Sequence, residues 1–186
     1  MQYIKSRHTI EDIIKKSRFI GVIIPVADEQ EALQCLRQLA ADYPDASHIA
    51  FAYRIRTEQV FICRFHDAGE PSGTAGKPIF QHLEGKDLIN VLVAVIRYFG
   101  GVKLGAGGLT RAYGNAAKHV IESAEIIDYV ELTRVRLTLA YPQMQQFEYQ
   151  LKKLDGRILQ QDFSEQIDFL VELPAANQEA LFKFLA

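Results

Sequence analysis

The sequence predicts an α+β protein of two domains, the first over residues 1–128 and the second, ferredoxin-like, over residues 129–186. Apolar segments with the period of strands alternate along the chain with segments that have the period of amphipathic helices. The chain has 186 residues, which is enough for one large domain or two small ones. After Glu125 the pattern starts again as strand, helix, strand, strand and helix, which is most of a ferredoxin-like unit.

The first elements are predicted from apolar runs and a helix cap. Residues 9–14 and 19–26 are rich in β-branched and apolar side chains, which predicts two strands of a hairpin or meander. Asp28, with Glu31 three residues later, has the pattern of a capping box. A helix is therefore expected from this point to Pro44, which stops it.

The middle of the chain predicts a strand pair at residues 49–55 and 59–65, followed by a short helix at 74–83. Residues 88–99 are nearly all apolar and rich in valine, which is typical of a strand buried on both faces. The clearest helix is predicted at residues 109–124, because apolar side chains form one stripe and polar side chains the opposite one.

The second domain is predicted as a strand near residues 130–141, a helix opened by Pro142, strands at 157–163 and 166–173, and a helix after Pro174. The pattern contains no fourth strand of a ferredoxin-like sheet. Either the chain ends before that strand or the domain closes its sheet in another way.

The composition excludes several classes of protein. Hydrophobic residues make up 48% and charged residues 24% of the chain, as in an ordinary soluble globular protein. No apolar run approaches the roughly 20 residues that span a bilayer, so we expect no membrane association and a cytoplasmic location. Cys35 and Cys63 lie far apart, and the five histidines follow no zinc-binding spacing. We therefore expect reduced thiols, no metal and no cofactor, and a monomer is favoured.

Six of the twelve glycines lie between residues 100 and 114, after a predicted buried strand and before a predicted helix. Backbone N–H groups, the positive end of a helix dipole and nearby cations can converge there on an anion such as phosphate. The glycines are equally compatible with a tight turn of positive φ that binds nothing, and both interpretations stay open. The candidate anion- or nucleic-acid-binding residues are Lys77, Arg97, Lys103, Gly105, Gly107, Gly108 and Arg111.

Neither standard nucleotide-binding fingerprint is complete. A dinucleotide G-x-G-x-x-G motif that begins at Gly105 would need glycine at position 110, where the chain has Thr110. A P-loop ending at Lys77 would need glycine in place of Pro71 and serine or threonine in place of Pro78. An ordinary ATPase or Rossmann enzyme is therefore disfavoured.

The second glycine-rich segment, residues 66–78, contains three glycines and two prolines and so cannot form a strand or a long helix. It predicts an ordered loop that leads into a helix capped by Ser72 or Thr74. Its side chains include the types found in acid–base or nucleophile–base pairs, but Ser72 lacks a G-x-S-x-G elbow. Binding is favoured over catalysis, and no catalytic residue is assigned. The candidate residues of this second loop are His66, Asp67, Glu70, Ser72 and Thr74.

Arg97 ends the predicted buried strand beside the glycine-rich segment. Two roles are compatible with that position. The guanidinium could contact a ligand directly, or it could pair with Asp67 or Glu70 and hold the two segments together.

Two long motifs carry a resemblance to a known family. HDAGEPSGTAGKP at residues 66–78 and RYFGGVKLGAGGLTRAYG at residues 97–114 closely resemble the bacterial YigZ proteins of the IMPACT family, and the likeness extends over essentially the whole chain. The resemblance implies a first domain with the fold of ribosomal protein S5 domain 2. It also implies that the ferredoxin-like domain is similar to the last domain of elongation factor G.

These implied folds lead to three hypotheses. Both folds occur in the part of elongation factor G that touches the ribosome, and eukaryotic relatives act in translational control. The first hypothesis is therefore a non-enzymatic, translation-associated regulator that binds nucleic acid or the ribosome through its glycine-rich face. The second is an enzyme or binder of a phosphorylated small molecule, because the S5-like fold also hosts small-molecule kinases. The third is an adaptor that binds a protein partner, as the eukaryotic relatives do.

Overall fold

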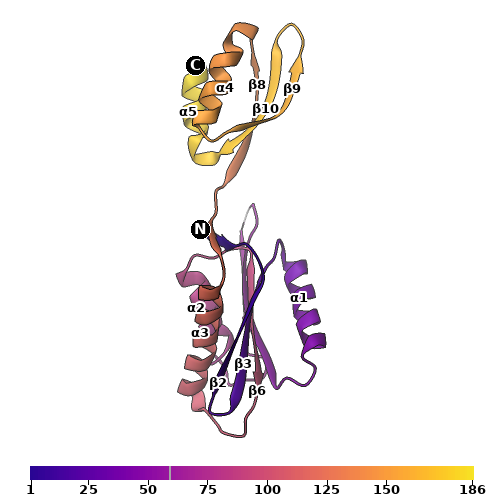
Figure 1. The fold of residues 1–186 in the computed structure, drawn as a ribbon, viewed down its shortest axis with the longest axis vertical. Helices are drawn as coiled ribbons and strands as arrows, with labels where there is room; N and C mark the ends of the chain where they lie inside the picture. Colours follow the sequence, from indigo (N-terminus) through magenta and orange to yellow (C-terminus); the bar gives the residue numbers. More distant parts are fainter. Residues whose placement is uncertain (59) are drawn as a thin grey trace. The chain divides into compact units, whose positions relative to one another are not determined.

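The computed structural model describes residues 1–58 and 60–186 and divides the chain into two compact units, Met1–Tyr129 and Val130–Ala186. Each unit combines strands with helices (Figure 1), so the predicted α+β class is confirmed. None of the helices in the described part of the chain is long and apolar enough to cross a membrane.

The first unit is built on a five-stranded antiparallel sheet with the strand order β2-β3-β6-β4-β5. Its strands are β2 (His8–Ile14), β3 (Ser17–Pro25), β4 (His48–Arg56), β5 (Phe61–His66) and β6 (Val91–Tyr98). Its helices are α1 (Glu29–Asp42), α2 (Gly76–Gly85) and α3 (Gly105–Ser123). Two short strands, β1 (Gln2–Ile4) and β7 (Ile126–Asp128), pair with each other and join the start of this unit to its end.

Helices cover both faces of this sheet, with α2 and α3 on one face and α1 on the other (Figure 1). Successive side chains of a strand point to opposite faces. Val93 and Val95 of β6 accordingly pack on the side of α2 and α3, whereas Leu92 and Ala94 pack on the side of α1. The prediction of a strand buried on both faces is confirmed, and this double burial explains its unbroken apolar run.

One end of the five-stranded sheet collects the connections that form the candidate site. Because neighbouring strands are antiparallel, β2, β5 and β6 end where β3 and β4 begin. The hairpin turn at residues 15–16 and the loops at 43–47, 67–75 and 99–104 therefore meet at this end, and α2 and α3 both start there (Figure 1). We call these four connections the loop end.

The second unit has a three-stranded antiparallel sheet in the order β8-β10-β9. Its elements are β8 (Leu132–Leu139), η1 (Tyr141–Gln143), α4 (Met144–Lys153), β9 (Arg157–Phe163), β10 (Ile167–Pro174), η2 (Ala175–Asn177) and α5 (Gln178–Leu185), where η marks a 3₁₀ turn. Phe147 of α4, Phe169 of β10 and Leu181 of α5 share its core. The predicted succession of strand, helix, strand, strand and helix is confirmed. No fourth strand pairs with β8 among the described residues.

Several boundaries differ from the predicted ones, and the start of α3 is the difference that bears on the candidate site. α3 begins at Gly105 rather than at residue 109, so Gly105, Gly107 and Gly108 lie in its first turn and not in a preceding loop. Glycine disfavours a helix by about 1 kcal/mol relative to alanine, which is why the sequence favoured a loop there. Gly105 itself has a φ of 75°, a backbone conformation that suits glycine. The strand predicted at 59–65 appears as β5 from Phe61, and residue 59 lies outside the described residues.

Candidate functional site

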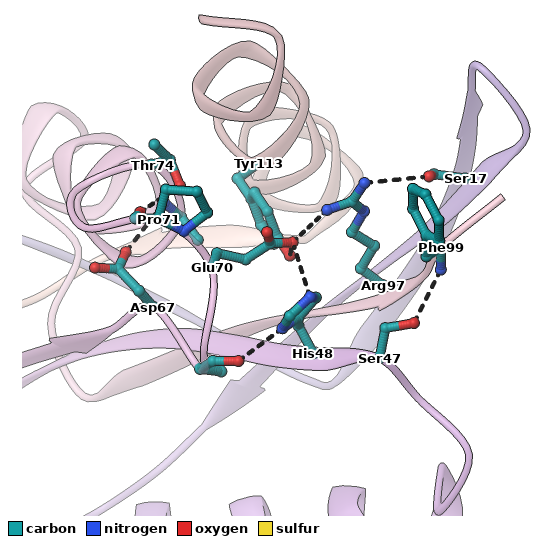
Figure 2. Close-up of polar contacts among 12 residues, drawn as sticks. Ser17, Ser47, His48, Asp67, Glu70, Pro71, Thr74, Arg97, Phe99 and Tyr113 are labelled. Atoms are coloured by element: carbon teal, nitrogen blue, oxygen red, sulfur yellow. Dashed lines mark hydrogen bonds and ion pairs between the residues drawn. The ribbon is translucent and has the colours of Figure 1, made fainter. Parts of the chain in front are cut away.

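A buried carboxylate, that of Glu70, lies within the loop end (Figure 2). Its Oε1 atom accepts hydrogen bonds from Arg97 Nη1 at 2.6 Å and from the Tyr113 hydroxyl at 2.7 Å. His48 Nε2 lies 3.6 Å from the same oxygen, and His48 Nδ1 lies 2.8 Å from the carbonyl oxygen of Ala68. Only 4% of the Glu70 side chain is exposed, so these partners rather than water balance its charge.

Arg97 is held from several sides. Besides its bond to Glu70, its Nη2 atom donates to Ser17 Oγ at 3.4 Å, and its guanidinium lies 5.5 Å from the ring centroids of both Phe19 and Phe99. Its Nε atom has no hydrogen-bond partner in the described part of the chain. The residue is 4% exposed. Of the two roles that the sequence left open, the structure contains the ion pair with Glu70, and the guanidinium is closed to solvent.

Tyr113 completes this network from the buried stripe of α3. Burial, together with the hydrogen bond to Glu70, raises the pKa of the Tyr113 hydroxyl far above its usual range. The hydroxyl therefore keeps its proton and acts as a donor. Through Ser17, His48, Arg97 and Tyr113, the carboxylate of Glu70 connects the 67–75 loop with β3, β4, β6 and α3, either directly or through one intervening side chain.

Asp67 organises the start of α2. Its carboxylate accepts backbone N–H bonds from Gly73 at 2.9 Å, Ala75 at 3.1 Å and Gly76 at 2.9 Å. The predicted cap by Ser72 or Thr74 is wrong. The residue at the cap position of α2 is Ala75, which makes no side-chain hydrogen bond, and the Thr74 hydroxyl donates to the Pro71 carbonyl. Burial alone would raise the pKa of Asp67, but the three N–H donors outweigh it and lower the pKa below its ordinary value.

Replacing Asp67 with asparagine is expected to lower the free energy of unfolding at pH 7 by about 1 kcal/mol, the difference between hydrogen bonds to a charged and to a neutral acceptor. Because the folded pKa of Asp67 lies below the unfolded value of about 3.9, the contribution of this carboxylate is present at neutral pH and is lost as the pH falls through the folded pKa. Urea unfolding at pH 7 and near pH 3 measures both effects. Asp45→Asn, at an exposed acid of the same loop end, is the control. An Asp67→Asn cost that does not shrink at low pH would contradict this account.

Gly100 brings the 99–104 loop directly against the hairpin turn. A Cβ atom on Gly100 would lie 2.1 Å from both the carbonyl carbon and the carbonyl oxygen of Lys16, so only glycine fits there. The Gly100 N–H donates to Ser17 Oγ at 3.2 Å. Lys15 and Lys16 form the turn with φ values of 46° and 66°. The two lysines are therefore fixed beside the glycine-rich loop.

The cations of the loop end, together with those in the first two turns of α2 and α3, are open to solvent. Lys15, Lys16, Lys77, Lys103 and Arg111 are all exposed, and none of them forms an ion pair with a residue that the structure describes. A Cβ atom on Gly107 would lie 3.5 Å from Arg111 Nη1, which shows that this guanidinium folds back over the first turn of α3. That turn has neither a side-chain cap nor an acidic residue.

The comparison with known proteins decides the family. The family model of the Impact N-terminal domain matches residues 15–121, which is more than half of the chain and includes the whole loop end. The chain belongs to the IMPACT family. A second model, described as a domain of unknown function (DUF1949), matches residues 137–186.

Relatives in the IMPACT family cover most of the chain. It is 34% identical to IMPACT family member YigZ of Escherichia coli, over 91% of this chain and 83% of the relative. It is 40% identical to IMPACT family member YvyE of Bacillus subtilis, over 86% of this chain and 73% of the relative. A crystal structure described as a hypothetical protein aligns with a TM-score of 0.68 at 32% identity, covering 100% of this chain and 90% of the other.

The remaining predicted residues of this IMPACT protein do not form catalytic pairs. His66 ends β5, stacks its ring 5.5 Å from that of Phe51, and accepts the Ala68 N–H through Nδ1. Ser72 is exposed and forms no hydrogen bond with His66, Asp67 or any other described residue. No group of three or more His, Cys, Asp or Glu side chains in the described ranges could hold a metal ion.

Sequence reasoning missed several members of the site. His48 and Ser17 lie far along the chain from Glu70 and Arg97, and the 15–18 segment was interpreted only as the link between two strands. The antiparallel pairing of β3 with β6 is what brings the Lys15–Lys16 turn to the glycine-rich loop. A predicted strand order would have been the signal that reveals both.

Proposed function

We propose that this protein binds nucleic acid, and that its loop end takes the phosphate groups of RNA. The observation that carries the proposal is the group of exposed, unpaired cations around the uncapped start of α3. Phosphate is the anion that lysine, arginine and free helix N–H groups commonly bind together. The phosphate contacts that we propose are Lys15, Lys16, Lys77, Lys103 and Arg111, with backbone N–H groups in the 105–108 turn.

The acids of the loop end leave this positive charge largely uncancelled. Asp67 is occupied by three backbone N–H groups, and Glu70 by Arg97 and Tyr113. Asp45 is the exposed exception. Arg97 is a support for the surface in this proposal and not a ligand contact, since its charge is compensated by Glu70.

The proposed activity is binding and not catalysis. A nucleophile needs a base within hydrogen-bond reach, and Ser72 has no such partner in the described part of the chain. The translational role that the family resemblance implies would make the ribosome or messenger RNA the source of the bound strand. That role, the cytoplasmic location and a protein partner stay predictions.

Binding of a fluorescent RNA oligonucleotide is expected to weaken steeply with salt. The logarithm of the association constant falls linearly with the logarithm of the salt concentration, with a slope of about −0.7 for each phosphate contacted on a single strand. In the double variant Lys103→Gln/Arg111→Gln, we expect weaker binding to every RNA sequence and a slope whose magnitude falls by about 0.7 for each cation removed. Fluorescence anisotropy between 50 and about 200 mM salt measures both.

Lys86→Gln is the matched control. Lys86 is also exposed, forms no ion pair with any residue that the structure describes, and lies at the far end of α2, away from the loop end. It is expected to leave affinity and slope unchanged. Absence of RNA binding by the unmodified protein at low salt would refute the proposal, as would an equal loss in the Lys86 variant. A thermal shift with a free sugar phosphate but not with RNA would instead favour the small-molecule hypothesis.

A further inference from the structure

Phe99 is an exposed aromatic residue at the start of the 99–104 loop of the loop end. Half of its surface, 50%, is open to solvent, and Val102 of the same loop is 39% exposed. It directly precedes Gly100, the residue that packs against the Lys15–Lys16 turn. An exposed apolar ring therefore lies at the same end of the sheet as the exposed cations. A single exposed aromatic residue is ordinary on a protein surface, so its setting must decide what it does.

The backbone and the ring of Phe99 are both held by contacts with other residues. Its backbone N–H donates to Ser47 Oγ at 3.0 Å, and the Arg97 guanidinium lies 5.5 Å from the centre of its ring (Figure 2). Arg97 is itself fixed by Glu70 and Ser17. The buried network thus contacts one part of the ring, and the exposed part of the ring remains open to a ligand. A preorganised ring loses little conformational freedom when another planar group stacks on it.

Proteins that bind single-stranded nucleic acid combine positive charge with exposed aromatic side chains, and the loop end has both. Its phosphates need positive charge, and its unpaired bases have open faces that stack on aromatic side chains. In a duplex the bases already stack on each other and offer no face to the ring. A polyanion without bases would make use of the cations but not of the ring.

We infer that the loop end binds RNA as a single strand and that one base stacks on Phe99. This inference rests on the proposed function and adds to it the form of the nucleic acid and the residue that selects it. Lys15, Lys16 and Lys103 hold the phosphates on either side of the stacked base.

Phe99→Ala is expected to weaken binding of a twelve-nucleotide uridine oligomer about tenfold, the effect of removing one stacked base. Binding of an RNA duplex and of heparin, a polyanion without bases, is expected to stay within about twofold, because the phosphate contacts are retained. Fluorescence anisotropy with the full-length protein measures all three. Phe61→Ala is the matched control: Phe61 is 47% exposed and lies 4.7 Å from an arginine, Arg54, but at the opposite end of the sheet.

Phe99→Trp gives a direct signal of stacking. The chain contains no tryptophan, so the new indole is the only one, and a base stacked on it is expected to quench its fluorescence. The oligomer is expected to retain its affinity for this variant. Uridine monophosphate is expected to bind far more weakly than the oligomer, because it carries a single phosphate.

The outcomes separate this inference from the proposed function. If the unmodified protein binds neither oligomer nor duplex at low salt, the proposed function fails and the inference with it. If it binds both equally and Phe99→Ala changes neither, the phosphate-binding function stands and the stacking inference fails. Equal losses in the Phe99 and Phe61 variants, an unquenched indole in a bound complex, or tighter binding of the mononucleotide would also overturn the inference.

Discussion

Replacing Glu70 with alanine is expected to lower the free energy of unfolding by about 3–5 kcal/mol, the usual cost of removing one partner from a buried ion pair. The variant leaves the buried Arg97 guanidinium without its carboxylate, and leaves the Tyr113 hydroxyl without its acceptor. Urea unfolding followed by circular dichroism measures the loss. Glu179→Ala, at a glutamate whose side chain is 80% exposed, is expected to change the stability by less than about 0.5 kcal/mol.

A double-mutant cycle tests whether the loss belongs to the pair. Arg97→Met removes the charge that Glu70 compensates, so the combined variant Glu70→Ala/Arg97→Met is expected to be more stable than the sum of the single losses predicts. Additive losses would show that the two side chains act independently. A loss below about 1 kcal/mol for Glu70→Ala alone would show that the buried carboxylate is dispensable for stability.

Gly100→Ala is expected to lower the free energy of unfolding by about 1–3 kcal/mol or more, the range for overpacking a tight site. The added Cβ would lie 2.1 Å from backbone atoms of Lys16, and backbone cannot turn away as a flexible side chain can. The 99–104 loop and the hairpin turn must therefore separate, which also strains the bond from the Gly100 N–H to Ser17.

Gly85→Ala is the control for this substitution. A Cβ atom at Gly85, the last residue of α2, would have no atom within 4 Å, and the residue has no positive φ. It is expected to cause no loss of stability, because alanine favours a helix over glycine. If the variants at positions 100 and 85 unfold at the same urea concentration, the close approach of Gly100 to Lys16 is not a constraint on the fold.

The elements of the fold could largely be predicted from the sequence. The apolar runs of β3 and β6, the capping pair at Asp28 and Glu31, and the stripe of α3 depend on local spacing, which a single sequence displays. The start of α3 was missed because its first turn contains three glycines, and local preference argued for a loop. Tertiary packing overrode that preference.

The partners within the candidate site could be predicted only in part. The sequence offered Asp67 and Glu70 as alternative partners for Arg97, and no local pattern decides between two acids three residues apart. The outcome depends on the path of the 67–75 loop, in which three N–H groups occupy Asp67 and leave Glu70 for the guanidinium. Tyr113 lies on the buried stripe of α3, but the partner of its hydroxyl depends on the folded arrangement of the 67–75 loop.

The contacts of the Glu70 network are all remote in sequence, and this governs when the loop end can exist. The bond from Arg97 to Glu70 spans 27 residues, that from Tyr113 to Glu70 spans 43, and that from Arg97 to Ser17 spans 80. Contacts between residues so far apart in the sequence form only when the intervening chain closes into loops, which lowers its conformational entropy. The loop end therefore needs β3, β4, β6 and α3 to be in place together. A nascent or partly unfolded chain contains the lysines and Phe99, but it does not bring them together at the loop end. Affinity for a ligand therefore reports that the whole first unit has folded.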